Sequence, residues 1–264
     1  MAFLNYEYKM KIIYSEPVEK CYFTLKAIPT EDFRQRSISY EISMLPDTRY
    51  SKSMDSFGNM QIIGSVASPH SEYEYTIRGL VETHNTNITG GIDESLLGMY
   101  KYPFGKCKPG PNINEFARFL EGEISNCKSD KEKCIRVMNI LNENMIYQSG
   151  STKIETSAEE AFSGRMGVCQ DFAHIYITVL RLLGIPARYV CGLIVGEGES
   201  HAWVEAACDG NYIAFDPTHN REIMDEYIKL GNGRDASDCT INKGVMWGGG
   251  NQTQIIEVYV EKYY

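Results

Sequence analysis

The hydrophobic pattern of this chain changes its period near residue 100, and that change constrains the fold more than any other feature. Up to about residue 90, apolar and polar residues alternate with period two, which predicts antiparallel strands. The alternation is clearest in three sets: Tyr6, Tyr8, Met10 and Ile12; Ile38, Tyr40, Ile42 and Met44; Tyr73, Tyr75 and Ile77. The turn-rich stretch 55–59 (DSFGN) separates two strands, so this part favours a β-sandwich or small barrel.

After a Gly- and Pro-rich linker at residues 102–111, the apolar residues recur at helical spacing. Three apolar faces are Ile113, Phe116, Ala117, Leu120 and Ile124; Cys134, Val137, Met138, Leu141 and Met145; and Phe172, Tyr176, Val179, Leu180 and Leu183. Asp130 is the expected cap of the second helix, Ser157 with Glu160 predicts a capping box, and Gly184 with Pro186 ends the third helix.

The rest of this half predicts strands over residues 189–195, 201–207 and 212–216. The expected fold class is therefore α+β, with an N-terminal antiparallel β-sandwich-like domain over residues 1–100 and a core of helices packed on an antiparallel sheet over residues 101–264.

Composition limits the partners and the compartment. The net charge is -9, and no cluster of Lys and Arg is present, which argues against nucleic-acid binding. The N-terminus lacks the apolar run of a signal peptide, and no stretch approaches the ~20 apolar residues of a membrane span. We therefore expect a cytoplasmic protein without a membrane partner. The eight cysteines form no CxxC pair, so neither a metal nor another cofactor is expected.

The hairpin formed by strands 201–207 and 212–216 brings two functional residue types together. A turn at Asp209 and Gly210, or a four-residue loop over 208–211, gives paired residue numbers that sum to 419. His201 and Asp216 then become diagonal neighbours on one sheet face, with Cα atoms about 7–8 Å apart. An imidazole and a carboxylate can bridge that distance, so the pair is a candidate base and its orienter.

Cys169 lies in the first turn of the predicted helix that carries Phe172 and Tyr176. A helix N-terminus and a neighbouring imidazolium both favour a thiolate, and the free N–H groups of that turn could stabilise an oxyanion. Gln170 and Tyr147 could also help an oxyanion. The alternative for Cys169 is inert packing. Spacing alone does not bring Cys169 to the sheet face that carries His201.

Three stretches together resemble the transglutaminase-like superfamily in its bacterial form. These stretches are GVCQDFAHIYITVLRLLGIPARYVCG, ESHAWVEA and FDPTHN. The strands around residues 55–59 resemble the N-terminal β-domain of such proteins, and residues 233–235 with a closing strand over 255–260 resemble their C-terminal end. The resemblance implies a papain-like core in which the cysteine helix packs against the sheet that carries the histidine and aspartate.

The resemblance further implies thiol-dependent acyl transfer or hydrolysis at peptide or protein amides, with Cys169, His201 and Asp216 as the catalytic triad. It favours a protease or amidase over a crosslinking enzyme. Water and an amine both stay open as acyl acceptors, and the sequence does not fix the oligomeric state. The alternative is a catalytically silent binding or scaffold module.

Four other residues near these motifs have competing interpretations. Trp203 and Glu205 share a sheet face with His201 and could either wall a substrate cleft or pack in the core. His174 is on the helix of Cys169 but five residues further along, which favours a core or solvated histidine. His219 is expected in a loop, where a substrate contact is an alternative.

Overall fold

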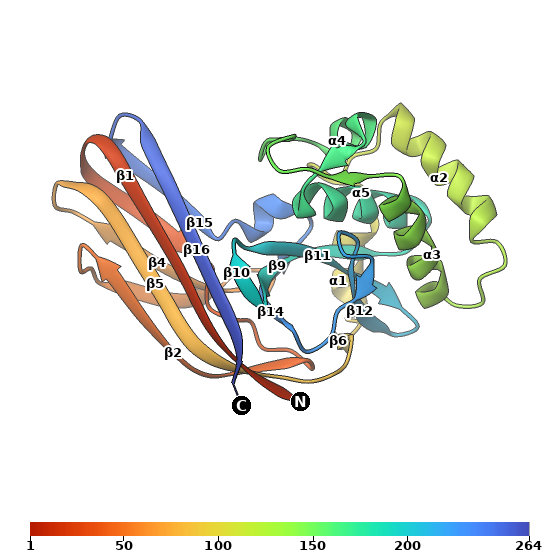
Figure 1. The fold of residues 1–264 in the computed structure, drawn as a ribbon, viewed down its shortest axis with the longest axis horizontal. Coiled ribbons are helices and arrows are strands. Elements are labelled where there is room, and N and C mark those ends of the chain that lie inside the picture. The colour runs from red at the N-terminus through yellow and green to blue at the C-terminus, as the bar shows by residue number, and fades with distance from the viewer. Residues whose placement is uncertain (264) are drawn as a thin grey trace.

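The computed structural model describes residues 1–263 and has two parts. Figure 1 shows a curved sheet at the left, formed by both ends of the chain, and a compact core of helices and strands at the right. The strand pairing within each of the two large sheets is antiparallel. The α+β class predicted from the change of hydrophobic period is confirmed.

The N-terminal sheet is organised by its long first strand. β1 pairs along residues 2–14 with β16 and β5, and along residues 18–25 with β15 and β4. β2 extends the first group and β3 the second. The bounds are β1 Ala2–Leu25, β2 Gln35–Leu45, β3 Tyr50–Met54, β4 Met60–Val66, β5 His70–Thr83, β15 Asn242–Gly248 and β16 Gln252–Tyr263.

Period-two alternation buries one side of these strands. Tyr6, Tyr8 and Met10 are at most 3% exposed, whereas the residues between them are only half-buried. The alternating apolar residues of β2 are less buried. Ile38, for example, is 43% exposed, since β2 is an outer strand that pairs with β5. The predicted turn at residues 55–59 joins β3 to β4, and Gly58 there has a φ of 80°, which favours glycine.

Five helices cover the core, among the residues that the structure describes. Their bounds are α1 Glu94–Lys101, α2 Pro111–Glu123, α3 Asp130–Glu143, α4 Ala158–Gly164 and α5 Cys169–Leu182. The predicted capping box of Ser157 with Glu160 is present at α4. The prediction of Asp130 as a cap was wrong by one residue: the Ser129 side chain accepts the Glu132 N–H, and Asp130 begins α3.

The core sheet has the strand order β13-β12-β11-β9-β14, with β6 added on β12. The bounds are β6 Ile88–Gly91, β9 Ala187–Ile194, β11 His201–Cys208, β12 Asn211–Asp216, β13 Arg221–Glu222 and β14 Tyr227–Gly233. A parallel pair, β7 (Ile146–Tyr147) and β8 (Met166–Gly167), precedes α5, and a short 3-10 helix (Ala236–Cys239) follows β14.

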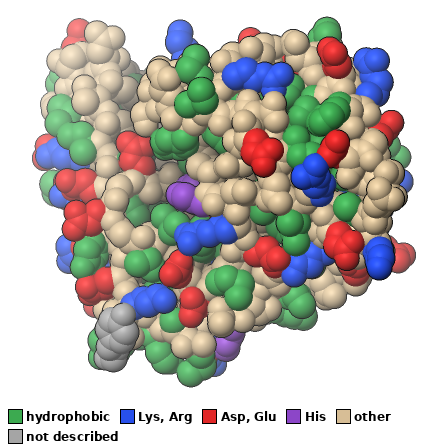
Figure 2. Space-filling view, turned by 45° about the vertical axis from the view of Figure 1, so that its right-hand side comes forward, with side chains coloured by type: hydrophobic (Ala, Val, Ile, Leu, Met, Phe, Trp, Pro, Cys, Tyr) green, Lys and Arg blue, Asp and Glu red, His purple; other side chains and the backbone are tan. Residues whose placement is uncertain are grey.

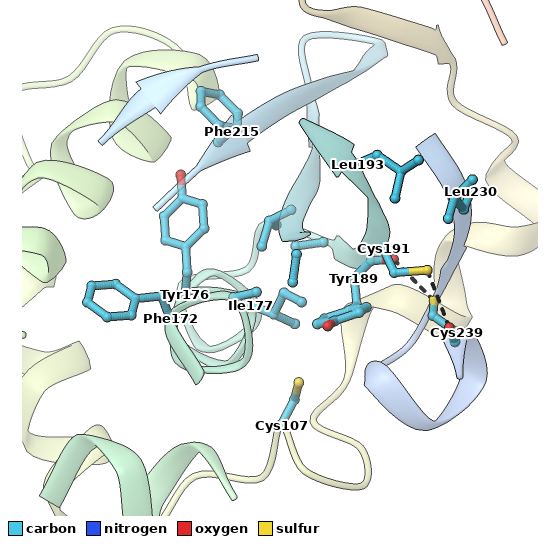
Figure 3. Close-up of a cluster of buried hydrophobic side chains, with 14 of the residues drawn as sticks. Cys107, Phe172, Tyr176, Ile177, Tyr189, Cys191, Leu193, Phe215, Leu230 and Cys239 are labelled. Atoms are coloured by element: carbon cyan, nitrogen blue, oxygen red, sulfur yellow. Dashed lines mark hydrogen bonds between the residues drawn. The ribbon is translucent and has the colours of Figure 1, made fainter. Parts of the chain in front are cut away.

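Helix α5 is the central helix of this core. In Figure 3 its side chains Tyr176 and Ile177 lie with Tyr189 and Phe215 from the sheet in one buried cluster. Each of these four is at most 4% exposed. The apolar face of α5 therefore fixes the helix against the strands, and with it the position of its first residue.

The two parts share a strand contact. β10 (Gly196–Gly198) follows β9 of the core but pairs with residues 258–260 of β16. The closing strand, β16, was expected in the core but lies in the N-terminal sheet beside β1. The domain boundary between residues 100 and 101 stays a prediction. None of the helices in residues 1–263 is long and apolar enough to cross a membrane.

Candidate active site

Cys169 is the first residue of α5, and the start of this helix is held by Asp171. The Asp171 carboxylate accepts the backbone N–H of Val168 at 2.8 Å and the Thr152 hydroxyl at 2.6 Å. A Cβ on Gly167 would lie 2.6 Å from the Asp171 Cβ, so only glycine fits this approach. These contacts place the partly exposed Cys169 at the N-terminal end of α5, where the helix dipole favours an anion.

The β11–β12 hairpin has the predicted register. Ala207 pairs with Tyr212 and Val204 with Phe215, so the paired numbers sum to 419. His201 Nε2 and Asp216 Oδ2 are 2.8 Å apart, and both residues are buried. The sheet therefore brings the predicted imidazole and carboxylate into direct contact.

The Asp216 carboxylate is fully buried and accepts several hydrogen bonds. Oδ2 accepts from His201, from His219 Nδ1 at 2.7 Å and from the Tyr227 hydroxyl at 2.8 Å. Oδ1 accepts the backbone N–H groups of Thr218 and His219 at 2.9 and 3.2 Å. Burial alone would raise the pKa of Asp216, but the hydrogen bonds from His201 and His219 hold that pKa well below its usual range.

His201 is held in a charged state by its neighbours. Burial lowers the pKa of the imidazole, but the hydrogen bonds to Asp216 and to Cys169, together with the charge of Asp216, raise that pKa from 6.5 to about 9. Because Nε2 donates to Asp216, Nδ1 is the ring nitrogen left for Cys169. Cys169, His201 and Asp216, which are distant in sequence, thus form one continuous group.

A groove of about 580 Å³ opens beside Cys169 and His201. One side is the segment from Ile194 to His201, which includes β10, and Val258 of β16 also contributes to the lining. Tyr147 lines the groove and is 55% exposed, whereas the Gln170 amide donates to the carbonyl of Ile154 instead. In Figure 2 a histidine side chain is visible in a hollow between the sheet and the core, and acidic and basic side chains are interspersed around it.

Three neighbours with competing interpretations are core residues. Trp203 is 0% exposed and packs edge-on against the Tyr227 ring at 5.5 Å. Glu205 is also 0% exposed and is paired with Lys229 at 2.9 Å. His174 is buried and accepts the N–H of Ala236 through Nε2, and burial lowers the pKa of this histidine to about 3.

A second cysteine and histidine lie close together in the N-terminal sheet. Cys21 Sγ is 3.8 Å from His70 Nε2, and His70 Nδ1 is 2.8 Å from the carbonyl oxygen of Ser68. Burial raises the pKa of the Cys21 thiol, which opposes thiolate formation. The orienting group is a backbone carbonyl rather than a carboxylate, so this pair lacks the charge arrangement found at His201.

His201, Asp216 and His219 offer three donor atoms within 4.8 Å of one another, a spacing that a metal ion could use. These atoms already hydrogen-bond to one another at 2.7 and 2.8 Å. Two imidazole N–H groups that donate to one carboxylate oxygen explain why these three side chains lie so close together, and this explanation requires no metal ion. The expectation that the protein needs no metal stays a prediction.

Sequence reasoning missed the contribution of Tyr227. Its strand, β14, contains the buried Lys229 among apolar neighbours and ends in Gly231 and Gly233, so its pattern resembles a loop. His219 lies after β12 as expected, but its Nδ1 contact with Asp216 was not predicted. A histidine three residues after a buried aspartate was the available signal, because a turn brings such residues together.

Comparison with known proteins identifies the family. Residues 118–217 match the transglutaminase-like superfamily, and residues 4–82 match the bacterial transglutaminase-like N-terminal region. An uncharacterized protein of Mycobacterium leprae is 29% identical over 255 residues, which cover 90% of this chain and 91% of that protein. An uncharacterized protein of Mycobacterium tuberculosis is 27% identical over 278 residues, which cover 94% of this chain and 88% of that one.

Among solved structures, a candidate cysteine protease from Cytophaga hutchinsonii superposes with a TM-score of 0.81 at 21% identity. The superposition covers 99% of this chain and 90% of that chain, so both parts of the fold are shared. The change from a strand-rich N-terminal part to a core of helices packed on a sheet is thus a feature of a known fold. The chain belongs to the transglutaminase-like superfamily and carries its bacterial N-terminal region.

Proposed function

We propose that this protein is a cysteine hydrolase or acyltransferase that acts on amide bonds of peptides or proteins. The observation that carries the proposal is the position of His201 between the Asp216 carboxylate and Cys169, with a pKa raised to about 9. A histidine that is cationic at neutral pH beside a thiol stabilises the thiolate, which is the nucleophilic form. The groove beside Cys169 and His201 would allow a substrate to reach both residues.

The first half of the proposed reaction forms a thioester. The Cys169 thiolate attacks the amide carbonyl, and the oxyanion lies near the N-terminal end of α5, where the first helical N–H bonds begin only at Asp171. The tetrahedral intermediate collapses as the C–N bond breaks, and His201 gives its Nδ1 proton to the leaving nitrogen. Asp216 orients the ring through Nε2 throughout.

The second half regenerates the thiolate. An acceptor attacks the thioester, neutral His201 takes the acceptor's proton, and the C–S bond breaks. Water as the acceptor gives a carboxylic acid, and an amine gives a new amide. The proposal favours water, and therefore a protease or amidase over a crosslinking enzyme.

A comparison of two partly exposed cysteines tests the nucleophile. Cys169 and Cys127 are both partly exposed, but of the two only Cys169 has an imidazole partner. We expect iodoacetamide to modify Cys169 faster than Cys127 at pH 7, and His201→Ala to remove that advantage. Peptide mass spectrometry of the alkylated protein measures both rates.

Turnover is tested with a library of fluorogenic peptide amides. We expect Cys169→Ala to abolish hydrolysis, and Cys127→Ala to retain it. If folded Cys169→Ala cleaves amides as fast as wild type, Cys169 is not the nucleophile. If Cys169 reacts no faster than Cys127, the catalytically silent binding module becomes the better description.

A further inference from the structure

His219 makes an unusual contact for a loop histidine, because its ring donates to the carboxylate that also orients His201. His219 Nδ1 is 2.7 Å from Asp216 Oδ2, and His201 Nε2 is 2.8 Å from the same oxygen. The two imidazole rings are 5.1 Å apart between centroids. The His219 side chain is 47% exposed, whereas that of His201 is 9% exposed, so the site contains one inner and one outer histidine on one acceptor atom.

Sharing an acceptor atom weakens each of the bonds made to it. Tyr227 donates to Oδ2 as a third partner, although a carboxylate oxygen offers about two lone-pair directions. Each donor that draws on the charge of Oδ2 leaves less of that charge for the His201 ring. The strength with which Asp216 holds His201 in its cationic form therefore depends on the other two donors.

We propose that His219 is a positioning residue that shares Asp216 Oδ2 with His201 and thereby moderates how tightly Asp216 holds the His201 cation. This inference rests on the proposed function, because its benefit is to catalysis. His201 must give its proton to the leaving nitrogen, and a ring held too firmly as a cation is a poor acid. The backbone N–H of His219 also donates to Oδ1, so His219 fixes the carboxylate from both oxygens.

The other titratable and charged groups around this carboxylate come from four elements. Cys169 of α5 contacts His201, and Tyr227 of β14 donates to Asp216. Arg221 of β13 donates through Nε to the Tyr227 hydroxyl and is itself 3.3 Å from Glu226, in the loop before β14. None of these four contacts involves the His219 ring, so a His219 variant tests the shared acceptor without removing any of them.

The test compares a variant that keeps the donor with one that removes it. In His219→Asn the side-chain amide can donate from nearly the position of Nδ1, whereas His219→Leu has no donor. We expect the titration midpoint of His201, followed by NMR of its ring carbons in the presence of EDTA, to rise in His219→Leu and to stay near wild type in His219→Asn. We expect kcat to fall by roughly three- to tenfold in His219→Leu, with little change in KM.

His84 provides a matched control. Its side chain is 44% exposed and lies 3.9 Å from the Glu82 carboxylate, but it is remote from Asp216 in the chain and is not among the donors to Asp216. His84→Leu should leave the His201 midpoint at its wild-type value. The proposal is overturned if the midpoint in His219→Leu equals or falls below that of wild type, or if His219→Asn shifts it as much as His219→Leu does. His219→Ala serves as a second donor-free variant.

The NMR readout separates this inference from the proposed function. It follows the His201 ring in the resting protein and requires no turnover. A raised midpoint in His219→Leu in a protein that cleaves no amide would support the shared acceptor and reject the enzyme. Amide cleavage with an unmoved midpoint would support the enzyme and reject the role of His219.

Discussion

His201 couples the candidate active site to the stability of the protein. Its pKa is about 9 in the folded protein and 6.5 for the free side chain, so the folded state binds its proton more tightly. The resulting stabilisation is fully present below pH 6.5 and is lost as pH rises to about 9. The pKa difference sets its size on the order of 3 kcal/mol, which is an upper bound for a strongly interacting pair.

We therefore predict that the free energy of unfolding of wild type falls more steeply between pH 6.5 and 9 than that of His201→Asn. Asparagine fills part of the same volume but does not titrate, so the difference between the two slopes reports the imidazole alone. Urea denaturation at closely spaced pH values measures both proteins. Parallel slopes in this pH range would show that Asp216 and Cys169 do not stabilise the cation.

At the scale of elements, the start of α5 determines where Cys169 lies. We predict that Gly167→Ala costs about 1–3 kcal/mol of stability and slows alkylation of Cys169, because the new methyl group would overlap Asp171 and disturb the cap of Val168. Urea unfolding and the alkylation rate measure the two effects.

The matched control for this change is Gly122→Ala. Gly122 is inside α2, and a Cβ there would meet nothing within 4 Å. This change should stabilise the protein by up to about 1 kcal/mol through higher helix propensity, and leave Cys169 unaffected. If Gly167→Ala behaves like Gly122→Ala, the close approach to Asp171 does not position the helix.

The elements differ in how much the sequence reveals about them. The His201–Asp216 contact could be derived, since a two-residue turn fixes the β11–β12 register and the pleat then places both side chains on one face. The burial of strand β14 could not be derived from the sequence, because a lysine in an apolar run argues against a buried strand unless the acidic partners of that lysine are known. Those partners come from β11 and from residue 32, and only the tertiary fold brings them together. The contact between Tyr227 and Asp216 could not be predicted for the same reason, because Tyr227 lies on β14.

The whole molecule is joined by buried polar contacts across its two parts. Lys229 Nζ is 2.9 Å from Glu205 of the core and 3.6 Å from Asp32 of the N-terminal part. Burial lowers the pKa of Lys229, and the nearby carboxylates oppose that effect. We predict that Lys229→Met costs up to about 3–5 kcal/mol, because Asp32 and Glu205 lose the buried cation that they share, and only Glu205 keeps a second partner, Arg188 at 2.6 Å.

Lys262 is the control for this prediction, since it is a half-buried lysine near two acidic residues, Asp225 and Glu226. Its Nζ lies 3.8 Å from Asp225, and its side chain is 32% exposed. Lys262→Met should cost at most about 1 kcal/mol. Urea denaturation measures the free energy of unfolding of both variants. If Lys229→Met and Lys262→Met lose the same amount of stability, burial does not strengthen the interaction of Lys229 with its carboxylates.

Side-chain amides from the N-terminal part also cover the outer edge of the core sheet. The amide of Gln35 accepts the N–H of Lys229 at 2.7 Å and donates to its carbonyl at 2.8 Å. Asn59 makes the same pair of bonds to the backbone of Asn232, at 2.7 and 2.8 Å. These amides complete the hydrogen bonding of β14 as a neighbouring strand would, so β14 depends on both parts of the molecule.

Because β14 and β10 each bond to the N-terminal part, we predict that the protein unfolds in one transition. The two tryptophans provide a probe for each part, since Trp247 lies on β15 and Trp203 lies on β11. Fluorescence of Trp247→Phe reports the core and that of Trp203→Phe reports the sheet. Each urea midpoint is compared with far-UV circular dichroism of the same variant, which corrects for the cost of the substitution. Fluorescence and dichroism should coincide in both variants, whereas separated midpoints would show that the sheet and the core are independent folding units.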